Sequence, residues 1–115
     1  MTNDQPQQLS GYKILWLYVM FDLPVLTPTE RRAATRFRKL LLDEGFEMAQ
    51  FSVYLRHASG KDAAEKYVNA IRRALPPRGK VHIVTITDKQ YGNAHVFSGK
   101  KREHRSGNPD QFLLF

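Results

Sequence analysis

Asp22 is the single charged residue in an otherwise apolar run from Ile14 to Pro24, and it stands close to the end of that run. The run is too short to span a membrane as a helix, and it indicates a strand that is buried on both faces. A carboxylate at the end of such a strand costs free energy unless it is solvated or partnered. It either accepts hydrogen bonds from N–H groups of the following turn or serves as an oxygen ligand for a divalent cation such as Mg²⁺.

A row of cations follows at helical spacing. Arg32, Arg36 and Lys39 lie at i, i+4 and i+7, so a helix places them along one line. Like charges at that spacing repel one another mildly, and the row costs stability unless an anion lies opposite it. The row is therefore either a solvated helix face or a surface that binds phosphate groups.

The whole chain is strongly basic. Its 115 residues contain 18 Lys and Arg against 11 Asp and Glu, which gives a formal net charge of +7. This surplus favours a polyanionic partner, and nucleic acid is favoured over a membrane because no basic helix with a Trp and Phe face is found. Cysteine is absent, which excludes disulfides and thiolate metal sites. The polar N-terminus lacks the basic start of a signal peptide, and we expect a cytoplasmic protein with no membrane partner.

Two helices are expected to position these residues. A capping box formed by Thr27 and Glu30 predicts a helix that stops at Gly45. A second helix is expected between Ser59, a plausible cap, and the pair Pro76-Pro77 that ends it. The other expected elements are one strand or a short bent pair over 47–57, a strand over 81–87, a turn over 88–93 and a short final strand over 94–98.

This order predicts an α+β fold, namely a ferredoxin-like βαββαβ sandwich with an extra short C-terminal strand. Two helices cover one face of such a sheet and leave the other face open. The residues expected on the open face form a larger apolar patch than monomers usually show: Trp16, Tyr18, Met20, Tyr54, Val84 and Ile86. We therefore expect a two-fold homodimer that packs sheet on sheet and brings both copies of Asp22 towards a shared cleft.

The chain divides into three segments by composition. Residues 1–11 are expected to be a disordered tail, residues 12–99 the ferredoxin-like domain, and residues 100–115 a basic linker that ends in an apolar docking segment. Successive apolar residues in an extended tail suit addition to the edge of a partner's sheet. The residues concerned are Lys100, Lys101 and Arg102, expected to lie over nucleic acid, and Phe112, Leu113, Leu114 and Phe115, expected to dock.

Three segments together resemble one known family. FDLP at 21–24, QFSVY at 50–54 and LPPRGKVHIVTITDKQYG at 75–92 occur in the order found in CRISPR-associated protein 2, especially the forms that accompany type II systems. The resemblance covers the chain from Tyr12 to about Lys101. It implies a ferredoxin-like homodimer that joins the CRISPR-associated integrase, protein 1, in capturing foreign DNA as new spacers. Many members are described as Mg²⁺-dependent endoribonucleases or DNases.

The resemblance also implies roles for particular residues. The metal-binding aspartate of the family corresponds to Asp22, which implies one Mg²⁺ shared between the two Asp22 residues of a dimer. Ser52 and Tyr54 fall where members carry residues implicated in cleavage. Arg31 and Arg32 fall at the arginine-bearing start of the first helix, and both are expected to contact nucleic acid. Some nuclease members carry Arg at the place that Met48 occupies, so this chain departs from the nuclease pattern there.

Three functions compete on these grounds. The first is an adaptor for spacer acquisition, a basic homodimer that holds duplex DNA and bridges integrase subunits. The second is a stand-alone, metal-dependent ribonuclease of toxin-like type. The third is a protein that binds single-stranded RNA on its sheet, which requires exposed stacking aromatics. The adaptor is the leading interpretation, with an Mg²⁺-dependent endonuclease activity as a second property of the same dimer.

Overall fold

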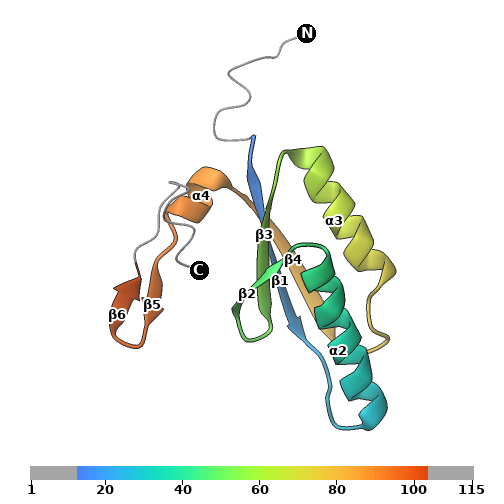
Figure 1. Ribbon diagram of the computed structural model, residues 1–115. Helices are drawn as coiled ribbons and strands as arrows, with labels where there is room; N and C mark the ends of the chain where they lie inside the picture. The colour runs from blue at the N-terminus through green and yellow to red at the C-terminus, as the bar shows by residue number, and fades with distance from the viewer. Residues whose placement is uncertain (1–12, 104–115) are drawn as a thin grey trace.

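The computed structural model describes residues 13–103 (Figure 1). The strands of its main sheet are β1 (Leu15–Asp22), β2 (Glu47–Gln50), β3 (Val53–Ala58) and β4 (Lys80–Thr87). The helices are α2 (Pro28–Asp43), α3 (Lys61–Arg73) and the short α4 (Asp88–Gly92), and a separate hairpin is made of β5 (Val96–Ser98) and β6 (Lys101–Glu103).

The main sheet has the order β2-β3-β1-β4, and each neighbouring pair is antiparallel. The strand β1 lies between β3 and β4, as its apolar sequence predicts. The helices α2 and α3 lie on the same side of the sheet (Figure 1). The predicted α+β class is confirmed, and the arrangement is consistent with the ferredoxin-like sandwich.

The main core lies between the sheet and these two helices. Alternate residues of β1, namely Leu17, Val19 and Phe21, point to the helix side and are buried there. The ring of Phe21 meets that of Phe37 from α2 edge-on, with ring centres 5.2 Å apart. The helix α2 begins with the predicted capping box, in which Thr27 and Glu30 bond reciprocally through side chain and backbone.

The short helix α4 covers part of the opposite sheet face, where the sequence predicted only a turn over 88–93. Thr87 and Gln90 form a second capping box that starts this helix. It places Tyr91 on Trp16 with ring centres 3.9 Å apart, and Trp16 Nε1 donates a hydrogen bond of 2.7 Å to Asp88 Oδ1. Trp16 is therefore buried by its own chain and is not an exposed platform for stacking bases.

The prediction that Tyr54 lies on the open face was wrong. Residues directly opposite one another in an antiparallel pair share a face, and Tyr54 pairs with Val19, which points to the helices. Tyr54 is accordingly 4% exposed and stacks on Phe21. The region 47–57 forms the β2–β3 hairpin with a turn at Phe51 and Ser52, and the pairing of β3 with β1 sets the side on which Tyr54 lies.

Two expected boundaries also differ from the structure. The N-cap of α3 is Gly60, which makes no side-chain cap bond, so the expected cap at Ser59 was wrong. The strand expected over 94–98 is shorter, and it pairs with β6 in a separate sheet. Lys101 and Arg102, at the start of the expected linker, therefore lie in a strand. Residues 13–103 contain no helix that is both long and apolar enough to cross a membrane.

Candidate functional site

Asp22 lies exposed at the end of β1, on the sheet face opposite the helices, and pairs in register with Lys80 of β4. The ion pairs formed among residues 13–103 are Lys39–Asp43 and Glu30–Arg78, so the Asp22 carboxylate takes part in none within this range. The backbone around it is tightly packed. A Cβ at Gly79 would lie 2.7 Å from the carbonyl oxygen of Asp22, and the φ of +98° at Gly79 also favours glycine.

The structure brings Ser52 close to the end of β1 and separates Tyr54 from Asp22. The backbone N–H of Phe21 donates a 3.1 Å hydrogen bond to the carbonyl of Ser52, which has a φ of 65°. A non-glycine residue in this region is uncommon and fixes the shape of the turn. The Tyr54 ring is buried on the helix side, whereas Asp22 faces the other side. Within one protomer, the two side chains therefore do not share a site.

The predicted cation row is exposed along α2. Arg32, Arg36 and Lys39 are all exposed. Arg32 Nη2 lies 3.3 Å from Thr29 Oγ1, and Lys39 pairs with Asp43 at 3.3 Å. An ion pair this exposed is weak and can exchange for a phosphate. The row therefore suits contact with a nucleic-acid backbone, which needs positive charge at regular spacing.

Arg31 is exposed but turns back on its own loop. Its Nη1 donates to the carbonyl oxygens of Val25 at 3.2 Å and Leu26 at 3.0 Å. These bonds were not foreseen, because the sequence grouped Arg31 with the nucleic-acid contacts. Its first role in the structure is to hold the β1–α2 loop.

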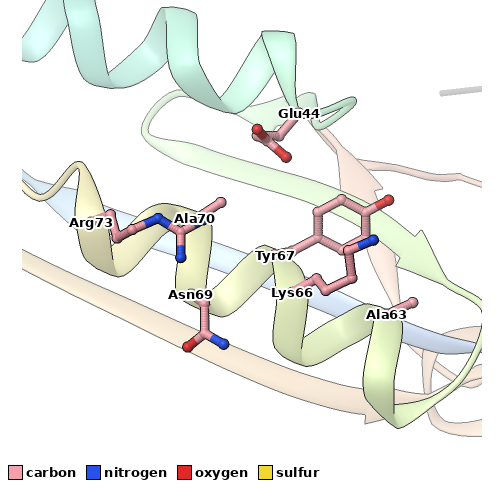
Figure 2. Close-up of a pocket in the computed structure, with 7 residues that line it drawn as sticks. All are labelled: Glu44, Ala63, Lys66, Tyr67, Asn69, Ala70 and Arg73. Carbon is pink, nitrogen blue, oxygen red and sulfur yellow. The ribbon is translucent and has the colours of Figure 1, made fainter.

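A groove beside α3 adds cations that were not among the predicted site residues. Figure 2 shows Lys66, Asn69 and Arg73 along α3, with Glu44 on the other side of the Tyr67 ring. The spacing of Lys66 and Arg73, two helical turns, is the signal that could have identified them.

Arg56 contacts two of the residues that line this groove, Tyr67 and Glu44. Its guanidinium carbon lies 4.1 Å from the centre of the Tyr67 ring. Its Nη1 donates a 2.6 Å hydrogen bond to the carbonyl of Glu44. The cation–π contact and the hydrogen bond together hold Tyr67 and the end of α2 in place.

The C-terminal cations lie on the β5–β6 hairpin. Lys100, Lys101 and Arg102 are exposed. Arg102 contacts the ring of His95 and lies 5.6 Å from the centre of the Phe97 ring. The predicted docking residues Phe112, Leu113, Leu114 and Phe115 lie outside the described residues.

The donor set for a metal is small. Among residues 13–103, no three His, Asp or Glu side chains gather closely enough to hold a metal ion. Asp22 offers one exposed carboxylate, which is the hard oxygen ligand that Mg²⁺ prefers. Mg²⁺ commonly keeps several waters and needs one or two carboxylates, so Asp22 fits such a site when a second copy supplies another.

The fold and this arrangement define a small basic α+β protein with an exposed acid at the end of its central strand and a row of cations on its first helix. The model of the family described as CRISPR associated protein Cas2 matches residues 15–94. The chain belongs to this family, which confirms the resemblance read from its motifs.

Curated relatives agree over nearly the full length. A CRISPR-associated endoribonuclease Cas2 of Paracidovorax avenae is 51% identical over 107 residues, which cover 93% of this chain and 99% of the relative. Proteins of the same name from Flavobacterium psychrophilum and Parvibaculum lavamentivorans are 43% and 46% identical. They cover 100% and 88% of this chain, and the alignments span 100% of each relative.

Proposed function

We propose that this chain is a CRISPR adaptation protein, a homodimer that binds duplex DNA by its backbone and bridges subunits of the CRISPR-associated integrase. The observation that carries the proposal is the exposed row of Arg32, Arg36 and Lys39 on α2. These cations lie on an outer helix, where a long polyanion can reach all of them. The net charge of +7 adds a long-range attraction for nucleic acid.

The dimer is supported by the sheet face that lies away from α2 and α3. Val84 is 42% exposed there, and Met20 and Ile86 are only partly buried. Stacking two such faces about a two-fold axis would remove this apolar surface from water. Since Asp22 belongs to the same face, the packing would also bring two carboxylates towards one cleft.

The experiment that tests this function is purification of the native protein at low salt, followed by identification of what accompanies it. The proposal predicts a dimer together with the integrase and duplex DNA. A monomer that carries neither integrase nor nucleic acid, at a salt concentration that preserves phosphate contacts, would contradict it.

A metal-dependent endoribonuclease is the second candidate; the names of the relatives favour the endoribonuclease, and its dependence on a metal is our proposal. Asp22 from each protomer would hold one Mg²⁺ at the dimer cleft. Mg²⁺ bound there supplies Lewis-acid chemistry, because it lowers the pKa of a bound water and neutralises charge on a phosphate. Residues of the chain itself would orient the RNA strand, among them Lys80, which lies opposite Asp22 in the sheet. We rank this activity second because Met48 stands where some nuclease members of the family carry Arg.

A further inference from the structure

The most exposed large apolar side chains of the β1–α2 loop are those of Val25 and Leu26, at 51% and 87% exposure. Single exposed apolar residues are common on protein surfaces and need no special explanation. These two are adjacent, however, and form an apolar tip next to the start of the basic helix α2. We call this pair the loop tip.

The backbone of the loop tip is held from both sides. Glu30 Oε1 accepts hydrogen bonds of 3.0 Å from the N–H groups of both Leu26 and Thr27. Arg31 Nη1 donates to the carbonyls of Val25 and Leu26, as described above. An exposed loop fixed in this way has little conformational entropy left to lose when it binds a ligand.

The inner residues of the loop are directed elsewhere. Leu23, Pro24 and Thr27 line a groove against the Pro76-Pro77 segment that follows α3. Arg78, which also lines this groove, lies 3.8 Å from the Glu30 carboxylate and forms a weak, partly exposed ion pair with it. Within the β1–α2 loop, the loop tip is thus the part that is presented to solvent as apolar surface.

We propose that the loop tip contacts an unpaired base of the bound DNA, a role that rests on the DNA binding proposed above. Cations lie beside the tip: Arg31 donates to its backbone carbonyls, and Arg32, the next residue, begins the row on α2. These groups attract phosphates, but the Leu26 side chain has nothing to offer a phosphate. It complements the apolar face of a base, and in a duplex that face is accessible only when the base is unstacked.

The test uses full-length protein and two DNA duplexes in which one 2-aminopurine is either paired or unpaired. Wild-type protein is expected to bind the unpaired form about tenfold more tightly, the order that burial of most of a leucine side chain provides. Leu26→Ala is expected to bind both DNAs equally. The increase in 2-aminopurine fluorescence that wild-type protein causes in the unpaired DNA should be smaller with this variant. The matched control is Leu42→Ala, which removes a 55% exposed leucine near the other end of α2 and should keep the preference.

Each of the other outcomes would refute a specific part of this proposal. Equal binding of the two DNAs by wild-type protein, or a preference that survives in Leu26→Ala, refutes the contact with a base. Tighter binding of an RNA duplex with the same unpaired base refutes the assignment to DNA. Loss of an integrase complex in Leu26→Ala, with the DNA preference intact, makes the tip a protein contact instead. Failure of wild-type protein to bind either DNA contradicts the proposed function itself.

Discussion

The Tyr54 ring stacks on that of Phe21 on the helix side of the sheet, with ring centres 5.7 Å apart. Asp22, which follows Phe21 in β1, faces the opposite side of the sheet. This relationship separates the two residues that the family resemblance had grouped as catalytic. It also gives Tyr54 a structural role, because the side chain is 4% exposed in the main core.

Tyr54→Phe is therefore expected to keep DNA binding and any cleavage, because it preserves the ring and its packing. Tyr54→Ala should lower the free energy of unfolding by about 3–5 kcal/mol, as expected for loss of a buried aromatic side chain. Urea denaturation and a cleavage assay check both variants. Loss of cleavage in Tyr54→Phe at unchanged stability would show that the hydroxyl takes part in the chemistry.

Gly79→Ala is expected to destabilise the chain and disturb the position of Asp22. The added Cβ would meet the Asp22 carbonyl oxygen at 2.7 Å, in addition to the strain of a φ of +98°. The control is Gly99→Ala, since Gly99 also has a positive φ but no heavy atom lies within 4 Å of the added carbon. Strain alone costs about 1–3 kcal/mol, so the variant at Gly79 should lose clearly more in urea denaturation. Equal losses would mean that the close approach to Asp22 does not matter.

Replacing Arg32, Arg36 and Lys39 by alanine is expected to weaken the binding of duplex DNA whatever the DNA sequence, because phosphate contacts do not read bases. Each phosphate contact that is lost should reduce the slope of log affinity against log salt by about 1. A salt titration of binding measures this slope. Lys61→Ala, which removes an exposed cation from the start of α3, is the control and should leave the slope unchanged. An unchanged slope in the triple variant would rule out the row as the phosphate-binding surface.

Deletion of residues 111–115 tests the apolar terminus. If Phe112, Leu113, Leu114 and Phe115 dock on the edge of a partner's sheet, the truncated protein should lose the dimer or the integrase complex on size-exclusion chromatography. Loss of the complex alone would assign the segment to the integrase. Formation of both assemblies at wild-type affinity would refute the docking role.

The sequence predicted the elements whose signals are local. The apolar run that ends at Asp22 indicated the central strand, and the capping box of Thr27 and Glu30 located the start of α2. A second capping box, Thr87 and Gln90, was equally visible but opens a helix of only five residues, which periodicity cannot reveal.

Features that depend on pairing between strands were harder to foresee. The side of the sheet that Tyr54 occupies follows from the register of β3 on β1, in which Tyr54 pairs with Val19, and a shift of one residue reverses it. The hydrogen bonds by which Arg31 holds the β1–α2 loop were not predicted for another reason. A cation such as Arg31 suits both phosphate and backbone carbonyls, and composition does not distinguish the two.

We propose that this protein acts in spacer acquisition by holding DNA and not by cutting it. The most direct measurement is spacer integration by the integrase in the presence of Asp22→Ala, with Asp62→Ala in α3 as an exposed-carboxylate control. Asp22→Ala is expected to dimerise, bind DNA and support integration at the wild-type level, while any Mg²⁺-dependent cleavage disappears. Loss of integration together with cleavage, in a variant that still dimerises and binds DNA, would contradict a purely DNA-holding role and place the chemistry of Asp22 at the centre of the function.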